Sequence, residues 1–373
     1  MWDKAMEQAA DKTKRNIGRF GDRFPQVTDG GPEYRLIPND DWINGFWTGI
    51  LWLCYERTGD EAFRLAARRA VESFRERLER NVVMDHHDIG FLYSLSSKAQ
   101  WIVEKDENAR QLTLRAADAL MKRWRPRLGL IQAWGKEGEP VNGGRIIIDC
   151  MMNLPLLYWA HMQTGDRRYL EAASAHADKS RRFLVRGDGS SYHTFIFDQE
   201  TGDAVGGATH QGYRNGSTWT RGQAWGIYGF ALSYRYTGRP EDLDTARRMA
   251  KHFVRRLPED GVVYWDFDAP VGPDTKRDSS ASAIAACGLH EIVGHLPADD
   301  PDRALLQEAL ERSMRSLVRD YTPRDPAVQG FIEHGAYGVL GGASADDCLI
   351  WGDYFYLEAL SRLTGGRKGY WYE

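Results

Sequence analysis

The sequence predicts an all-α fold, an (α/α)6 barrel of six helical hairpins with an inner apolar ring and an outer amphipathic ring. Three observations predict it. An apolar helix, a Thr-Gly-Asp-like stop and a charged helix recur along the chain; each kind of helix is expected six times; and the two ends of the chain complement each other. With 42% hydrophobic residues, residues 1–373 can form one catalytic domain around a single large core.

The expected elements follow one another in a regular order. A charged helix at residues 3–20 has no apolar helix before it. Five hairpins follow, each an apolar and then a charged helix, at residues 47–78, 91–124, 153–184, 223–257 and 281–317. A last apolar helix, residues 350–366, has no charged successor, so the first helix can pack beside it and close a ring. An open solenoid of hairpins is the alternative, and the complementary ends favour the ring.

The two kinds of helix differ in how their apolar residues are spaced. In the charged helices apolar residues recur every three or four positions, as in Phe63, Ala67, Val71 and Phe74, so that one stripe is buried. The other six helices are apolar nearly all round, as expected of helices that are covered on both sides.

Four segments do not read as helix because they are rich in Gly, Pro, Asp and aromatic residues: 21–40, 126–148, 186–220 and 258–278. Each leads from a charged helix to the next apolar one, so all four should meet at one rim and build a pocket over the inner ring. Within the last segment, "GVVYWDFDAP" predicts a short strand or hairpin arm.

Composition excludes several classes of function. Lys plus Arg is 49 and Asp plus Glu is 53, a net charge of −4 without a basic run, so neither nucleic acid nor a membrane surface is an expected partner. The N-terminus shows no apolar signal region, and a soluble, cytoplasmic protein is expected. The four cysteines form no C-x-x-C pair and there is no H-E-x-x-H, so neither a metal site nor a thioredoxin-like motif is expected. Nothing in the pattern indicates the oligomeric state.

Two carboxylates are candidates for catalysis. Asp149 follows three isoleucines in "GGRIIIDCMMNLP", where an ionised carboxylate would lose water, and Asp88 begins the neighbouring apolar helix. If the helices form a ring, the two acids face each other, so one can hold a proton at neutral pH while the other stays ionised. The alternative is that such Asp residues cap helix N-termini, as is expected of Asp41, Asp278 and Asp353.

The same rim is rich in tryptophan and in polar side chains. Flat aromatic faces beside hydrogen-bonding groups suit sugar rings, and "THQGYRNGSTWTRGQAW" is the densest such stretch, with Gln211, Ser217 and Trp219. Arg221 stands in the first turn of an apolar helix, where it can bind the carboxylate of an acidic sugar or pair with a rim Asp.

Long motifs resemble the bacterial unsaturated glucuronyl hydrolases of glycoside hydrolase family 88, among them "DHHDIGFLYSLSSKAQW", "GGRIIIDCMMNLPLL", "STWTRGQAWGIYGFA" and "IWGDYFYLEAL". The resemblance implies hydrolysis of lyase-generated oligosaccharides that carry a 4,5-unsaturated uronic acid at the non-reducing end, through hydration of the C4=C5 double bond and without a cofactor. It implies that Asp149 is the general acid and that Asp88 is either a substrate-binding partner or a nucleophile. It also implies these substrate-binding residues: Trp42, Asn44, His87, Trp134, His193, Gln211, Trp219, Arg221 and Trp225.

Alternatives remain at this point: an unsaturated rhamnogalacturonyl hydrolase, a sugar epimerase that would use His, and a non-catalytic sugar-binding barrel. The segment 331–351 is expected to contact the second sugar. This segment holds no Lys or Arg. Its acids are Glu333, Asp346 and Asp347, and His334 is expected to be neutral. Tyr337, between small residues, is expected to stack on an uncharged ring, so unsulfated substrates are predicted.

Overall fold

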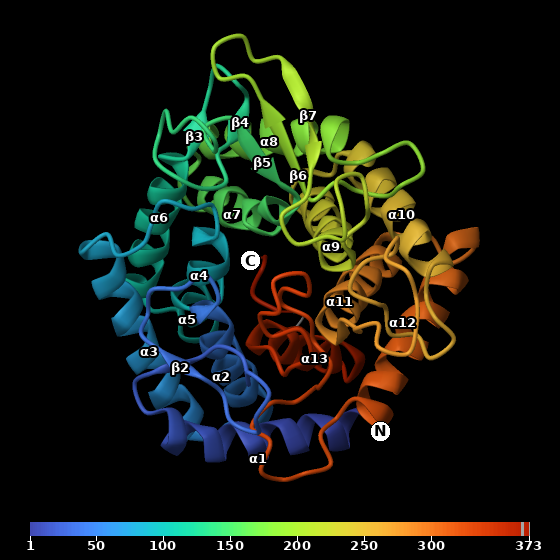
Figure 1. Ribbon diagram of the computed structural model, residues 1–373. Helices are drawn as coiled ribbons and strands as arrows, with labels where there is room; N and C mark the ends of the chain where they lie inside the picture. The colour runs from blue at the N-terminus through green and yellow to red at the C-terminus, as the bar shows by residue number, and fades with distance from the viewer. Residues whose placement is uncertain (367–368, 373) are drawn as a thin grey trace.

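The computed structural model describes residues 1–366 and 369–372 and confirms two concentric rings of helices (Figure 1). Within these residues the outer ring consists of α1 (Trp2–Phe20), α3 (Glu61–Glu79), α6 (Glu107–Met121), α8 (Arg167–Phe183), α10 (Pro240–Arg255) and α12 (Pro301–Asp320). The inner ring consists of α2 (Asn44–Thr58), α4 (Ile89–Ser94) with α5 (Ser97–Glu104), α7 (Leu154–Thr164), α9 (Thr220–Thr237), α11 (Ser279–His295) and α13 (Ile350–Leu363). Within the described part of the chain, no helix combines the length and the apolar character needed to cross a bilayer.

The recurrent Thr-Gly-Asp sequence connects the two rings, because its Gly ends an inner helix and its Asp begins an outer one. Gly59 and Gly165 adopt left-handed conformations, with φ of 69° and 73°, and end α2 and α7. The next residues, Asp60 and Asp166, cap α3 and α8 by accepting hydrogen bonds from backbone N–H groups of the first turn. The repeat in the sequence is therefore a repeated cap, which places each outer helix directly behind its inner partner.

The second inner helix is divided, whereas the sequence predicts one continuous helix. Ser96 interrupts it between α4 and α5, and its Oγ donates to the carbonyl oxygen of Leu92 at 2.6 Å. Serine side chains compete with the backbone for such hydrogen bonds, which weakens a helix at this point.

The ends of the chain close the barrel. Helix α1 packs against α2 and α13, and Asn16 Nδ2 donates to the carbonyl oxygen of Gln329 at 3.0 Å. Beyond α13 the chain turns into the centre of the inner ring (Figure 1), where Trp371 is fully buried and stacks on Phe355 with ring centroids 5.9 Å apart. Residues 370–372 form this central plug, which no pattern in the sequence predicts.

Short strands lie in the segments that lead from outer to inner helices. Antiparallel hairpins join β1 (Phe24–Pro25) to β2 (Leu36–Ile37) and β3 (Trp124–Arg125) to β4 (Leu130–Ile131). A three-stranded antiparallel sheet has the order β5 (Arg145–Ile147), β6 (Thr194–Phe197), β7 (Ala204–Ala208). The strand expected in "GVVYWDFDAP" forms only isolated bridges, Trp219 with Asp266 and Tyr264 with Arg277, because this segment spans between two helices and finds no continuous partner.

Candidate active site

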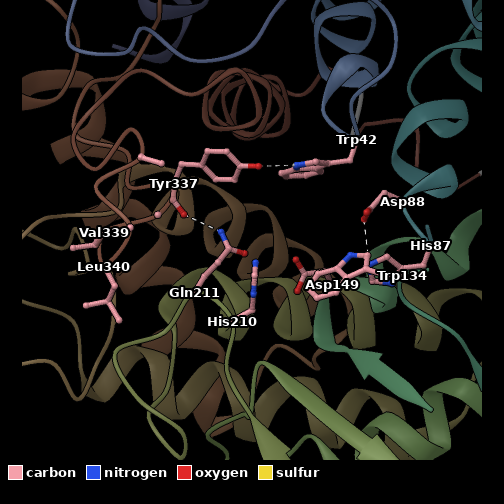
Figure 2. A pocket seen from close by; sticks show the side chains of 13 residues that line it. Trp42, His87, Asp88, Trp134, Asp149, His210, Gln211, Tyr337, Val339 and Leu340 are labelled. Atoms are coloured by element: carbon pink, nitrogen blue, oxygen red, sulfur yellow. Dashed lines mark hydrogen bonds and ion pairs between the residues drawn. The ribbon is translucent and has the colours of Figure 1, made fainter. Parts of the chain in front are cut away.

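A cavity of about 460 Å³ lies at the rim of the inner ring (Figure 2). Its walls come from five parts of the chain, and the residues that line it are Trp42, His87, Asp88, Trp134, Asp149, His210, Gln211, Tyr337, Gly338, Val339, Leu340, Gly341 and Ala343. The segments 126–148 and 186–220 contribute to these walls as expected. Segments 21–40 and 258–278 contribute no lining residue to this cavity among those described; Trp42 lies just beyond the first of them, and residues 337–343 before α13 complete the wall.

Asp149 is held at the cavity by a strand and a 3-10 turn. β5 ends at Ile147 and the turn η1 (Ile148–Met152) begins directly after it; α7 follows from Leu154, with Pro155 in its first turn, where a missing N–H costs no helix hydrogen bond. The side chain keeps 16% of its surface exposed, and its Oδ2 has no hydrogen-bond partner among the described residues. Burial, followed by the charge of Asp88, raises the pKa of Asp149 from 3.8 to about 8.

Asp88 stands at the N-terminus of α4 but does not cap it with its side chain. Its Oδ1 accepts from Asn153 Nδ2 at 3.4 Å and lies 3.4 Å from His87 Nε2, and its Oδ2 lies 3.5 Å from His86 Nδ1. Burial acts to raise the pKa of Asp88, but the two histidines and Asn153 outweigh it, so the pKa lies below 3.8. Asp88 is therefore ionised at neutral pH while Asp149 holds its proton.

The helix-cap alternative applies to only one of the five rim carboxylates. Asp278 accepts from the N–H of Ala281 and caps α11. Asp353 instead lies inside the first turn of α13 and accepts from the N–H groups of Phe331 and Ile332, and Asp41 accepts from the N–H of Trp42 before α2 begins. The expected caps at Asp41 and Asp353 are thus wrong, since both carboxylates bind loop backbone rather than their own helices.

His193 approaches Asp149 from the neighbouring strand. β5 pairs with β6 so that Ile147 lies opposite Thr194, and the N–H of Ile148 donates to the carbonyl oxygen of His193 at 3.0 Å. Nδ1 of His193 accepts from the N–H groups of His210 and Gln211 at 3.1 and 3.3 Å, so its proton is on Nε2, which lies 4.0 Å from Asp149 Oδ2. Burial keeps the pKa of His193 well below 6.5, so the ring is neutral.

Aromatic side chains form the walls on either side of the acids (Figure 2). Trp42 Nε1 donates to the hydroxyl of Tyr337 at 3.3 Å, and Gln211 Nε2 donates to the carbonyl oxygen of Tyr337 at 2.8 Å. Trp134 packs edge-on against His210, with ring centroids 5.2 Å apart. His87 lies between Trp134 and Asp88, and burial lowers its pKa to about 4.

Six residues predicted to bind substrate do not line the cavity. Asn44 accepts from the N–H of Asp41, and Ser217 donates to Asp266 at 2.7 Å. These six buried residues are Asn44, His193, Ser217, Trp219, Arg221 and Trp225. Trp219 packs at a tilt against His193 with ring centroids 4.3 Å apart, and Trp225 packs at a tilt against Phe91 at 5.1 Å, so both support residues of the site without lining the cavity.

Arg221 adopts the second of its two expected roles, a pair with a rim carboxylate. Its Nη1 lies 2.6 Å from Asp278 Oδ2, and the two side chains are 1% and 0% exposed. Its Nη2 donates to the carbonyl oxygen of Tyr337 at 3.0 Å. In this arrangement Arg221 holds the Tyr337 segment against α9 and α11, and direct contact with a substrate carboxylate stays a prediction.

Several residues of the site were not predicted individually. Val339 and Leu340 line the cavity, and Leu340 is 65% exposed. They belong to segment 331–351, which was expected to contact the second sugar, but the glycines of this loop indicate a turn and not its direction. Asn153, which contacts Asp88, follows Asp149 by four residues, a spacing typical of neighbours on a helix.

Paired carboxylates of unequal proton affinity, set between tryptophans at the mouth of an (α/α)6 barrel, define the class of carbohydrate-active barrel enzymes. The comparisons with known proteins specify the family. The chain belongs to glycosyl hydrolase family 88, whose sequence model matches residues 16–351.

Its relatives cover nearly the whole chain. The unsaturated glucuronyl hydrolase of Bacillus sp. (strain GL1) is 62% identical, over 100% of this chain and 99% of the relative. A solved structure of a substituted UGL with dGlcA-Glc-Rha-Glc is 62% identical, covers 100% of this chain and 99% of that chain, and has a TM-score of 0.98. A substituted unsaturated glucuronyl hydrolase from Streptococcus agalactiae, complexed with dGlcA-GalNAc6S, is 39% identical, with coverage of 99% and 93% and a TM-score of 0.88.

Proposed function

We propose that this chain removes the 4,5-unsaturated uronic acid from the non-reducing end of lyase-generated oligosaccharides by hydrating the C4=C5 double bond. The observation that carries the proposal is the state of Asp149, a carboxyl group that keeps its proton at neutral pH because its pKa is raised to about 8 and that lines a cavity walled by Trp42 and Trp134. The named relatives act on, or are complexed with, sugars of this kind.

The first step is proton transfer to carbon. The substrate is an enol ether, whose electron-rich C4 accepts the proton of the Asp149 carboxyl while the ring oxygen stabilises the positive charge that develops at C5. A general acid with a pKa near the working pH favours this step, and such groups contribute about 10²–10⁴-fold in rate. Asp149 is left as a carboxylate, and the Nε2–H of His193 is directed toward it from 4.0 Å.

Water then adds at C5 and gives up a proton to a carboxylate. The net transfer of this proton to Asp149 restores its protonated form. The product at C5 is a hemiketal, so the ring opens, the bond to the remaining sugar breaks and the saccharide leaves. Asp88, ionised and facing the same cavity, serves either as a binding partner that tunes Asp149 or as a nucleophile; both roles use its anionic form.

The defining experiment follows the ultraviolet absorbance of the double bond in an unsaturated chondroitin or gellan fragment. We expect wild-type protein to abolish it and Asp149→Asn to leave it, with substrate binding retained because the amide preserves shape and removes only the proton. A non-catalytic barrel or an epimerase would leave the absorbance unchanged with wild-type protein. Normal turnover by Asp149→Asn would refute the role of Asp149.

We further propose a preference for unsulfated substrates. Among the residues that the structure describes, no Lys or Arg lines the cavity, and the segment from Tyr337 to Ala343 is uncharged. Lys276 does not line the cavity and pairs with Asp346 at 3.0 Å, and Asp346 also lies 2.7 Å from His334 Nδ1. His334 was expected to be neutral; its hydrogen bond with Asp346 raises its pKa and so favours the charged form, whose charge Asp346 opposes.

The test compares kcat/KM for an unsulfated and a 6-sulfated unsaturated chondroitin disaccharide. We expect the unsulfated sugar to be the better substrate, because the uncharged wall offers a sulfate no partner to replace its lost water. A higher value for the sulfated disaccharide would show that a cation such as Lys276 leaves Asp346 to bind it.

A further inference from the structure

Asn153 joins the two acids of the site, although it does not line the cavity. Its side chain is fully buried. Nδ2 donates to Asp88 Oδ1 at 3.4 Å and to the carbonyl oxygen of Asp149 at 3.3 Å. One amide group therefore contacts both residues on which the proposed chemistry depends, one through its side chain and the other through its backbone.

The orientation of this amide is fixed by a third contact. The N–H of Phe91 in α4 donates to Asn153 Oδ1 at 2.8 Å, so the amide cannot turn its oxygen toward Asp88. The backbones also approach closely here, since a Cβ placed on Gly90 would lie 2.4 Å from Asn153 Cα. Asn153 thus fastens the start of α4, which carries Asp88, to the turn that carries Asp149.

We propose that Asn153 is a positioning residue that sets the placement of Asp88 relative to Asp149 and gives Asp88 the hydrogen-bond donor that keeps it the anionic partner. The inference rests on the proposed function for its catalytic meaning. Its geometry is independent of that function, because all three hydrogen bonds lie within the protein.

Other charged and titratable groups also act on Asp88, and they limit the size of the expected effect. His87 and His86 favour its charged form. The groups that face it from other elements are Arg77 of α3, Asp149 and Cys150 of η1, and Tyr337 of the loop before α13. Loss of the Asn153 donor alone should therefore raise the pKa of Asp88 by about one unit, the size expected of a single hydrogen bond to a charged group.

The experiment uses two variants of different design. Asn153→Asp keeps the volume and an acceptor for Phe91 N–H but replaces the donor with a second carboxylate oxygen. Asn153→Leu keeps similar volume and removes all polar contacts. Asn16→Asp is the matched control, because Asn16 is also buried and also donates to a backbone carbonyl oxygen, in α1 far along the chain from the acids.

We expect the acidic limb of the kcat profile to move up by about one pH unit in Asn153→Leu and further in Asn153→Asp, whose added carboxylate also repels the charge of Asp88, with KM changed less than about twofold because Asn153 does not line the cavity. Asn16→Asp should lose stability and keep the wild-type profile. A wild-type acidic limb in either folded Asn153 variant would overturn the proposal, and so would an equal shift in the control.

A second measurement separates this proposal from the proposed function. Titration of the Asp88 carboxyl carbon by NMR, in wild type and in both Asn153 variants, needs no substrate. An upward shift of the Asp88 pKa in the variants is expected whether or not the double bond is consumed. An unchanged titration would overturn the role of Asn153 while leaving the hydration reaction standing.

Discussion

Replacing Asp149 with Asn should make the protein more stable at neutral pH while it abolishes activity. In the folded chain burial and then Asp88 raise the pKa of Asp149 to about 8, whereas the ordinary value is 3.8. The unfolded chain therefore releases a proton that the folded chain keeps. The stability that this carboxyl contributes is fully present below the ordinary value and is lost as pH rises toward the folded value.

The size of the effect follows from the same two values. Neutral pH lies about three units above the pKa of this carboxyl in the unfolded chain. That difference corresponds to a loss of at most about 4 kcal/mol in the free energy of unfolding. Asn has the same shape and no proton to release, so Asp149→Asn should recover most of this lost free energy of unfolding. With an entropy of unfolding of about 2.1 cal/mol/K per residue, the expected gain in Tm is up to about 5 °C.

The assay is thermal or denaturant unfolding of both proteins at about pH 4 and about pH 7.5, where the stability difference should be near zero and near its maximum, respectively. Glu104→Gln is the control of opposite sign. Burial acts to raise the pKa of Glu104, but hydrogen bonds from Arg64 and Arg68 lower it, so this variant should lose stability at neutral pH. A wild-type Tm for Asp149→Asn at about pH 7.5 would refute the raised pKa.

Three further predictions follow from the geometry. The kcat profile should fall as pH rises through about 8, the pKa of Asp149, and a rate that keeps rising there would contradict the general acid. Trp371→Ala should cost about 3–5 kcal/mol in denaturant unfolding because it empties the barrel centre; an unchanged midpoint would contradict this. Arg221→Ala should cost about 3–5 kcal/mol by leaving Asp278 buried without its partner, and Arg221→Ala/Asp278→Ala should recover part of that. If Arg221→Ala instead keeps its stability and loses affinity for an unsaturated uronate more than for a neutral analogue, Arg221 binds substrate directly.

The two rings could be predicted because their signals are local. Apolar spacing within one helix and the Gly and Asp of each stop depend on residues a few positions apart, and Gly59 with Asp60 behaves as the pattern indicates. That Asp88 and Asp149 face one cavity could be predicted from the ring, because both stand where neighbouring inner helices begin. Their different proton affinities could also be expected, because the isoleucines before Asp149 and the histidines before Asp88 are visible in the sequence.

The parts that could not be predicted depend on pairings between distant residues. The β5–β6 register brings His193 to Asp149 across more than forty positions, and Arg221 finds Asp278 across 57. Such contacts leave no periodic trace, so a sequence can indicate that Arg221 needs an anion without indicating which one. The direction of the loop at Tyr337 is of the same kind, since it depends on Gln211 and Arg221 binding one carbonyl oxygen.

The central plug has a consequence for the order of folding. Trp371 Nε1 donates to Glu358 at 2.8 Å and its carbonyl oxygen accepts from Tyr236 at 2.7 Å, so this residue completes contacts with two inner helices. Residues 370–372 follow all the helices of both rings in the chain, so they can dock only after those helices have come together. Until they dock, the aromatic side chains that line the centre, Phe91 and Phe355 among them, lack their contacts with Trp371. A barrel with both rings formed and residues 370–372 undocked therefore exposes apolar surface at its centre, and an intermediate of this kind is prone to aggregation.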